Sequence, residues 1–158
     1  MPHTRMLGVS FDSEGIPKFH TSPTSIKVED INLSSKASLT FAFQRTLGSI
    51  SLEGLLEPLS SKELERDWQK LDQDFQRNYF VFGHQSGRKI DFLAELRTEQ
   101  DRLPNYREKD RPSSFIGYSF KTIDRITFYT VAEKDFALCE LYERDLDTRS
   151  WIYSLRVP

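Results

Sequence analysis

Three histidines and a single cysteine are the residues of this chain best suited to hold a metal or to act as a nucleophile. Thiolates and imidazole nitrogens are the usual ligands of zinc, but His3, His20 and His84 show no metal-ligand spacing among themselves or with Cys139. Cys139 lies in an apolar segment with no activating base beside it, which indicates a small buried hydrophobe on a strand. We expect neither a metal site nor a catalytic cysteine.

Carboxylates gather in one segment of the chain, where a pair could serve as acid and base. They are Glu63, Glu65, Asp67, Asp72 and Asp74. The segment has the pattern of a helix, so we interpret these side chains as its solvated face. The loop between Gly83 and Gly87 lacks the strand–helix unit of a dinucleotide-binding fingerprint. No catalytic residue is assigned.

The bulk composition indicates one soluble globular domain spanning residues 1–158. Net charge is -2 with both signs interspersed, which argues against nucleic acid as a partner. No apolar run is long enough to span a membrane, and the N-terminus does not resemble a signal peptide. With only one cysteine, we expect a cytoplasmic location.

Alternating apolar residues predict strands at both ends of the chain. Residues 6–11 and a second piece ending at Thr21 form a hairpin around the turn at 12–15. A polar stretch follows from 22 to 36. After it, Leu39, Phe41 and Phe43 alternate with small and polar residues, and Ile50 and Leu52 belong to a matching strand. Four more strands are predicted at 116–120, 125–130, 137–144 and 151–156.

Two helices are predicted between the strands. The capping box Ser60-Ser-Lys-Glu63 opens the first, and Leu64, Trp68, Leu71 and Phe75 form its apolar stripe, with Trp68 in the core. The second begins after Gly87, turns Ile90, Leu93 and Leu96 inward, and stops before Pro104; a loop follows at 105–114. About eight strands with a helical insertion predict a mainly β protein with some α, built as an antiparallel barrel.

Short segments spread over nearly the whole chain carry a family resemblance. They are FHTSPTSIK at 19–27 followed by ASLTF at 37–41, RML at 5–7, LEG at 52–54, HQS at 84–86, PSSFIGY at 112–118 and WIYSLRVP at 151–158. In this order they resemble the pyridoxamine 5'-phosphate oxidase family. The resemblance implies an antiparallel split β-barrel, a homodimer, and FMN held at the subunit interface. The N-terminal helix and first strand of that family have no counterpart before Arg5, so we expect a shortened barrel with an open edge.

The resemblance also implies which residues would bind FMN. They are Arg5, Met6, Leu7, Thr21, Ser25, Lys27, Gln85 and Ser86. Arginine, lysine and hydroxyl groups suit a phosphate dianion, which is held by charge-assisted hydrogen bonds. Three flavin contacts of the family are replaced here, a lysine by Ser10, an arginine by Ile26 and a glutamine by Ser49.

The side chains that the family uses for its substrate are missing. The tyrosine, arginine and serine that clasp the substrate phosphate are Trp68, Asp72 and Gln76 in this chain. The family's Arg-Leu-His-Asp-Arg motif falls within residues 136–141, where there is neither arginine nor histidine, and its preceding tryptophan is Tyr129. A carboxylate at Asp72 repels a phosphate.

Three functions remain open. The first is a pseudoenzyme that no longer oxidises vitamin B6 phosphates and acts as a dimeric binding module, with a second copy or another protein as its partner. The second is an FMN-binding flavoprotein, an oxidoreductase with a different or residual substrate, because flavin carries the redox chemistry itself. The third is a true oxidase completed by residues of another subunit. The sequence does not decide whether the chain is an enzyme, and the missing substrate residues favour the view that it is not.

Overall fold

The structure, a computed structural model, describes residues 3–87, 89–101, 110–131 and 136–157. It divides into two compact units. The helical unit comprises Met1–Leu33 and Glu57–Ser119, and the sheet unit comprises Ser34–Leu56 and Phe120–Pro158. Two long strands each contribute residues to both units.

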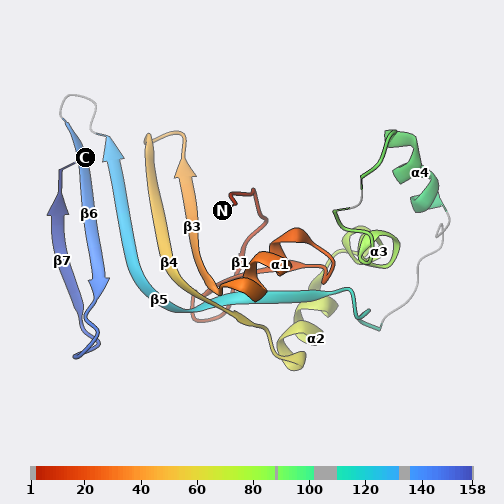
Figure 1. Cartoon of the computed structure of the whole chain (residues 1–158), viewed down its shortest axis with the longest axis horizontal. Helices are drawn as coiled ribbons and strands as arrows, with labels where there is room; N and C mark the ends of the chain where they lie inside the picture. Colours follow the sequence, from red (N-terminus) through yellow and green to blue (C-terminus); the bar gives the residue numbers. More distant parts are fainter. Residues whose placement is uncertain (1–2, 88, 102–109, 132–135, 158) are drawn as a thin grey trace. The chain divides into compact units, whose positions relative to one another are not determined.

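The sheet unit is built from five neighbouring strands (Figure 1). They are β3 (Lys36–Phe43), β4 (Gly48–Pro58), β5 (Ile116–Val131), β6 (Ala137–Arg144) and β7 (Trp151–Arg156). The β3–β4, β5–β6 and β6–β7 pairs are antiparallel. On β3, Leu39 and Phe41 are half-buried while Ser38 and Thr40 are exposed, as the alternating pattern predicted.

Close approach of two backbones requires a glycine on β4. A Cβ at Gly54 would meet the carbonyl oxygen of Thr122 on β5 and would lie 3.0 Å from the Cα of Ile123. Neither neighbour can move aside cheaply, because both are backbone atoms. The glycine therefore lets β4 and β5 lie against each other at this point.

The helical unit contains four helices and two short strands among the described residues. They are β1 (Ser10–Phe11), β2 (Pro17–Thr21), α1 (Ile26–Leu33), α2 (Ser61–Lys70), α3 (Gln73–Phe82) and α4 (Leu93–Asp101). β2 pairs antiparallel with β1 and with the first residues of β5, where Phe19 lies opposite Tyr118. The expected β1–β2 hairpin is confirmed, with its turn closed by Asp12 and by Gly15 at φ 80°.

Aromatic rings form the core of this unit. Trp68 and Phe115 are fully buried and meet edge to face at 5.1 Å between centroids, with Leu59 and Leu64 beside them. Tyr79 of α3 adds a second edge-to-face contact to Phe115 at 4.8 Å. The prediction that Trp68 belongs to the core is confirmed, and such ring pairs stabilise beyond their buried area.

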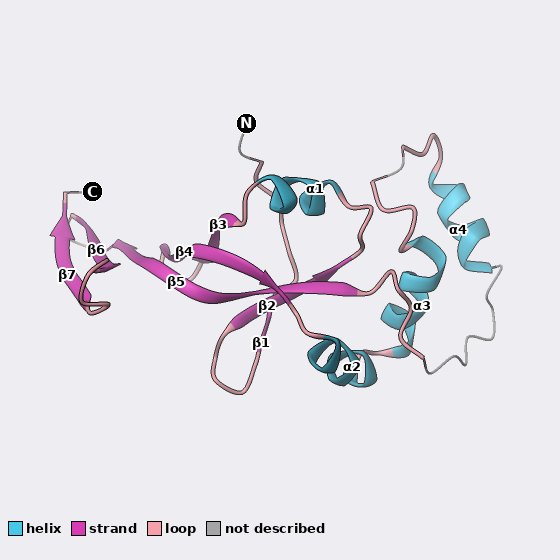
Figure 2. Cartoon of the chain, turned by 60° about the horizontal axis from the view of Figure 1, so that its bottom comes forward, coloured by secondary structure: helices cyan, strands magenta, loops and turns pink. Residues whose placement is uncertain are grey.

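The helix predicted from Ser60 is two helices rather than one (Figure 2). The capping box is present, but α2 ends at Lys70 and Leu71 is extended. Asp72 then caps α3 by accepting a hydrogen bond from the backbone N–H of Asp74 at 2.9 Å. The apolar residues keep their spacing of four and three across the break, which explains why one helix was predicted. Phe75, which was predicted to belong to the apolar stripe, is 62% exposed.

Other boundaries also differ from the sequence predictions. The first strand is only Ser10–Phe11, because the residues before it have no strand partner, and residues 116–130 form one strand instead of two. The polar stretch from 22 to 36 contains α1, which buries only Val28 and so gives little periodic signal. α4 begins at Leu93, whose side chain is 64% exposed, so the prediction that Leu93 points inward is wrong, whereas Ile90 and Leu96 are half-buried. Pro104 and residues 105–109 lie outside the described residues.

Candidate functional site

A pocket of about 260 Å³ opens in the helical unit where the end of β2 meets α3. Its lining surface is mainly apolar, although most of the contributing residues carry a polar group, and none of them is Lys, Arg, Asp or Glu. The lining residues are His20, Thr21, Ser22, Asn78, Tyr79, Phe82, Gly83 and Ser86. Of the expected FMN-binding residues, Thr21 and Ser86 therefore reach the same cavity.

Hydrogen bonds tie together the elements that form this pocket. Thr24, after β2, donates its hydroxyl to the carbonyl of Gly83 at 3.2 Å, and Ser114 donates to the carbonyl of Tyr79 at 2.7 Å. A side chain at Gly83 would collide with Ser114 and with the Tyr79 carbonyl. The end of α3 is thus held against its neighbours by contacts that require a glycine.

Lys27 organises a second polar cluster beside the pocket. Its Nζ donates to the hydroxyl oxygens of Thr21 at 3.0 Å and Ser25 at 2.7 Å, and both hydroxyl residues are buried. Burial lowers the pKa of Lys27, and the positive charge of Arg5 lowers it further. No carboxylate forms an ion pair with Lys27 among the described residues. Three of the expected flavin residues thus form one cationic cluster, the Lys27 cluster.

Arg5 is already paired with an acid. Its guanidinium donates to Asp30 Oδ2 at 2.7 Å, and the His3 ring lies 3.1 Å from the same oxygen. These hydrogen bonds lower the pKa of Asp30. Arg5 therefore adds positive charge near Lys27 while it serves as the partner of Asp30.

Of the remaining expected residues, Met6, Leu7 and Gln85 make no described contact with the pocket or with the Lys27 cluster. Met6 is 99% exposed and Leu7 is half-buried in the segment before β1. Gln85, in the turn after α3, donates its side-chain amide to the Val81 carbonyl at 3.4 Å. Ser86 alone of this group lines the pocket.

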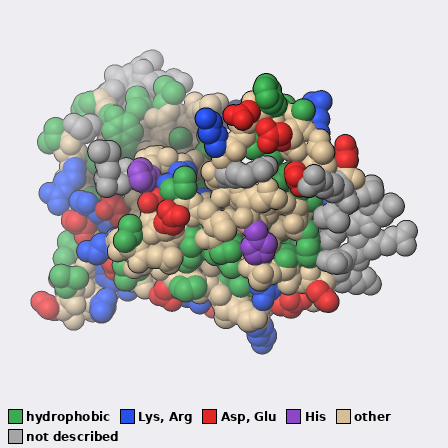
Figure 3. Space-filling model, turned by 45° about the vertical axis from the view of Figure 1, so that its right-hand side comes forward, with side chains coloured by type: hydrophobic (Ala, Val, Ile, Leu, Met, Phe, Trp, Pro, Cys, Tyr) green, Lys and Arg blue, Asp and Glu red, His purple; other side chains and the backbone are tan. Residues whose placement is uncertain are grey.

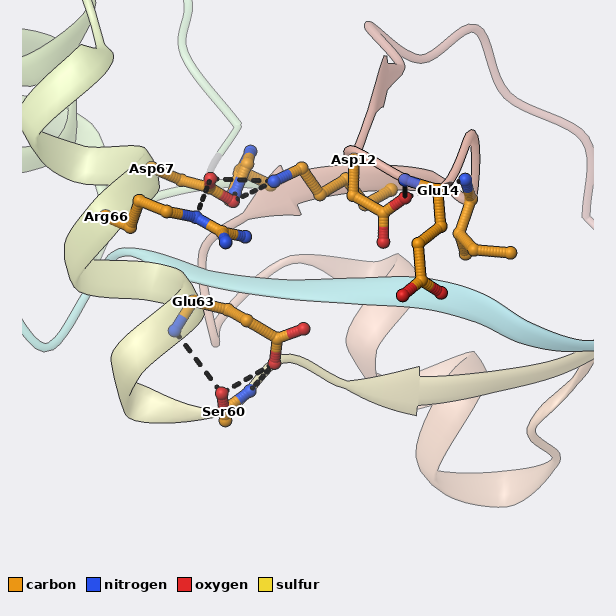
Figure 4. A network of polar contacts seen from close by, with 9 residues as sticks. Asp12, Glu14, Ser60, Glu63, Arg66 and Asp67 are labelled. Atoms are coloured by element: carbon orange, nitrogen blue, oxygen red, sulfur yellow. Dashed lines mark hydrogen bonds and ion pairs between the residues drawn. The ribbon is translucent and has the colours of Figure 1, made fainter.

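A buried charge network lies at the wall of the pocket and was not anticipated. Lys18 Nζ contacts both carboxylate oxygens of Asp67, at 2.7 and 2.6 Å, and His20 Nε2 lies 3.1 Å from Asp67 Oδ2. Figure 4 shows Asp67 on α2 beside Arg66. The side chains of Lys18, Asp67 and His20 are 8%, 10% and 17% exposed. Interpreting Asp67 as part of a solvated helix face was therefore wrong.

The sequence did carry a signal for this network. Asp67 lies three residues after Leu64 and four before Leu71, so it belongs to the apolar stripe of α2 rather than to the face opposite. Lys18 and His20 are two apart on β2 and share one face of the strand. An acid on a buried helix face needs a cationic partner, and a strand with two basic residues on one side offers it.

Burial changes the proton affinity of two pocket residues. Burial lowers the pKa of His20, and this effect exceeds the upward influence of the Asp67 carboxylate. Burial also raises the pKa of Tyr79 to about 12. At neutral pH the pocket wall is therefore formed by a neutral tyrosine and a histidine that resists protonation.

The positions aligned with the family's substrate residues are used inside the fold. Trp68 is fully buried, Asp72 caps α3, and Gln76 donates its side-chain amide to the carbonyl of Trp68 at 2.7 Å. Cys139 on β6 is half-buried rather than buried, with Tyr129 opposite it on β5.

Comparison with solved structures identifies the fold. No protein-family model matches the chain, and a search of curated proteins gives no match. The chain is similar to PhzG from Burkholderia lata 383, solved in complex with tetrahydrophenazine-1-carboxylic acid, with a TM-score of 0.83 at 20% identity over 98% of this chain and 74% of PhzG. It is also similar to a pyridoxamine 5'-phosphate oxidase-related, FMN-binding protein from Nostoc punctiforme PCC 73102, with a TM-score of 0.80 at 18% identity over 100% of this chain and 81% of the other.

The chain therefore has the split β-barrel fold of pyridoxamine 5'-phosphate oxidase-like proteins, mainly β with four helices among the residues that the structure describes. This confirms at the level of the fold the resemblance seen in the sequence.

Lys and Arg lie interspersed with Asp and Glu on the face drawn in Figure 3. Within the described ranges, no helix is long and apolar enough to cross a membrane. Over the same ranges, no group of three or more His, Cys, Asp or Glu side chains is arranged to hold a metal ion.

Proposed function

We propose that this chain binds a phosphorylated cofactor, with FMN as the candidate, and that the Lys27 cluster holds its phosphate. The observation that supports this most strongly is a half-buried ammonium group with two buried hydroxyl partners and no carboxylate partner among the described residues. A partly buried cation without a counterion is costly, and a bound anion removes that cost.

The chemistry of the cluster fits a phosphate group. The hydroxyl oxygens of Thr21 and Ser25 accept from Lys27, so each keeps its own O–H to donate to a phosphate oxygen. The ammonium supplies a charge-assisted hydrogen bond. The cluster also lies at the start of α1, where the helix dipole favours negative charge.

The adjoining pocket suits part of a larger ligand. Its volume of about 260 Å³ lies just below the roughly 300–1,000 Å³ usual for small-molecule sites. Tyr79 and Phe82 offer flat apolar surface, and Asn78 and Ser86 offer hydrogen bonds. When bound, FMN would supply the redox chemistry, while Lys27, Thr21 and Ser25 bind and orient it.

We further propose that the chain does not oxidise vitamin B6 phosphates. Asp72 and Gln76 are engaged as a helix cap and as a partner of a backbone carbonyl, and Trp68 fills the core. None of the three is a cation that could bind a substrate phosphate. The prediction is that FMN-loaded protein leaves pyridoxine 5'-phosphate unchanged under conditions in which an authentic oxidase of this fold converts it.

A second copy of the chain is the partner we propose. Phe128, Leu138, Tyr142, Trp151, Tyr153 and Leu155 share one face of β5, β6 and β7, because paired residues and residues two apart lie on the same side of a sheet. Leu155 and Tyr153 are 58% and 50% exposed. Glu140 and Arg144 share this largely apolar face. An exposed apolar face marks an interaction surface, and a twofold dimer covers such a face with itself.

FMN titration tests the cofactor proposal. Fluorescence quenching of FMN should saturate with the wild-type protein, and Lys27→Gln should weaken binding by about 10- to 150-fold, which corresponds to loss of one charged hydrogen bond of about 1.5–3 kcal/mol. Lys62→Gln is the matched control, because Lys62 is an exposed lysine of the same unit. Equal affinity of the wild type and Lys27→Gln would refute the assignment of the phosphate to Lys27.

Light scattering coupled to size exclusion tests the dimer. The wild type should elute with twice the chain mass, and Leu155→Asp should give monomer. Leu146→Asp is the matched control, because Leu146 is 86% exposed in the turn between β6 and β7. A monomeric wild type at micromolar concentration would contradict this proposal and leave the cofactor proposal standing.

A further inference from the structure

The ring of His20 is fixed on two sides at the wall of the pocket. Its Nε2 contacts Asp67 Oδ2 at 3.1 Å, and the ring stacks on Phe115 with 4.6 Å between centroids and 13° between planes. Asp67 is fixed in turn by both contacts to Lys18. The ring therefore has a defined orientation before any ligand binds.

These contacts determine which nitrogen carries the proton. The Asp67 carboxylate is ion-paired with Lys18 and can only accept hydrogen bonds. A contact between this carboxylate and Nε2 therefore requires Nε2 to be the donor. In the neutral ring, Nδ1 is then left with a free lone pair and is the basic atom.

The basic atom faces accessible space. His20 lines the pocket, and Nδ1 has no hydrogen-bond partner among the described residues. It is also not one of the sealed polar atoms that lack a partner. An imidazole nitrogen with a lone pair, an accessible position and a carboxylate behind the opposite nitrogen is the arrangement of a general base.

We propose that His20 is the proton acceptor of this pocket and that it receives a hydrogen bond, or a proton, from an O–H or N–H group of the bound ligand. Asp67 and Lys18 are positioning residues that fix the neutral Nε2–H form. In a transfer step, the proton leaves the ligand oxygen or nitrogen for Nδ1, the electron pair stays on the ligand, and the Asp67 carboxylate stabilises the imidazolium.

The groups around His20 support the neutral form as its resting state. Asp67 faces it from α2, Lys18 lies beside Asp67 from β2, and Tyr79 of α3 lines the same pocket. The half-exposed Arg66 lies 3.8 Å from Asp67. Lys18 already balances the charge of Asp67, so protonating His20 would leave an excess positive charge in a buried network. Burial lowers the pKa of His20, as this argument requires.

Nitrogen-15 NMR of the unliganded protein tests the assignment without any ligand. There are three histidines, so His20→Gln assigns the His20 signals by their loss, with His3 and His84 as internal references. At pH 7.5 we expect the neutral Nε2–H tautomer for His20. A neutral Nδ1–H tautomer, or an imidazolium at pH 7.5, would overturn the proposal.

A ligand measurement tests the role of Nδ1 in binding and rests on the proposed function for its choice of probe. Riboflavin carries O–H and N–H donors without a phosphate, so its binding does not depend on a phosphate at Lys27. His20→Gln keeps a donor for Asp67 but removes the basic nitrogen, and should bind riboflavin about 3- to 10-fold more weakly at pH 7.5. The wild-type affinity should fall as the pH is lowered from 7.5 through the pKa of His20, which burial lowers, with little change in the variant. Equal binding of riboflavin by the wild type and the variant would refute a role for Nδ1 in ligand binding. If neither FMN nor riboflavin binds at all, the cofactor proposal is refuted, and the NMR result on the His20 tautomer still stands.

Discussion

Replacing Lys18 with methionine isolates the energetic role of the buried network. The side chain is 8% exposed and its ammonium makes both short contacts to Asp67. Methionine fills similar space but leaves the carboxylate without its main counterion, and breaking a buried pair in this way costs about 3–5 kcal/mol. With an unfolding entropy of about 2.1 cal/mol/K per residue over 158 residues, each kcal/mol lowers the melting temperature by about 3 °C. The expected loss is about 9–15 °C.

Calorimetry and urea unfolding measure this loss, and three comparisons sharpen it. Arg156→Met is the control, because Arg156 is 56% exposed in its pair with Glu143 and such pairs contribute about 0–1 kcal/mol. The double variant Lys18→Met with Asp67→Leu should be more stable than Lys18→Met alone, because it leaves no unpaired charge. The deficit of Lys18→Met should also shrink at pH 5.5, where a protonated His20 can replace the missing cation. A loss for Lys18→Met no larger than that of Arg156→Met would refute the buried network as a structural element.

Three further predictions concern the helical unit. Trp68→Ala should lower the free energy of unfolding, measured in urea, by about 3–5 kcal/mol, because it leaves a cavity at the centre of the aromatic core. A decrease below about 1 kcal/mol would contradict the packing described. Asp72→Ala should lower the free energy of unfolding by about 1 kcal/mol, because α3 loses its N-cap. The neighbouring Asp74→Ala should lower it less, and the midpoints of urea unfolding compare the two variants. The pKa of His20 is lowered in the folded chain, so the unfolded state binds the proton more tightly. The His20 contribution to stability is therefore full above about pH 6.5 and is lost as pH falls from there through the folded pKa, and His20→Gln should lack this component.

Strand periodicity and the α2 capping box made much of the fold predictable. Leu39 and Phe41 alternate with exposed residues over most of β3, although Phe43 at its end is exposed, and the Ser60 capping box marks where α2 begins. The break between α2 and α3 was not predictable from apolar spacing, because the residues on both sides of Asp72 keep the helical repeat. α1 was missed because a short helix with one buried residue has almost no periodic pattern.

The candidate site was predicted in part, and the limits follow from long-range packing. Thr21, Ser25 and Lys27 are close in sequence, so a short motif was enough to group them. Lys18 and Asp67 are 49 residues apart, and their contact depends on how α2 packs against β2. A charged residue on the apolar face of a helix requires a buried partner of opposite charge, and on this ground Asp67 could have been recognised from the sequence.

The central claim is that Lys27 holds a phosphate, and the most direct measurement compares FMN with riboflavin on two proteins. The two ligands differ only by the phosphate, so the ratio of their dissociation constants reports what the phosphate contributes. For the wild type we predict FMN to bind about 10- to 150-fold more tightly than riboflavin, and for Lys27→Gln this preference should fall to a few-fold. An equal preference for FMN in both proteins, or none in the wild type, would contradict the account.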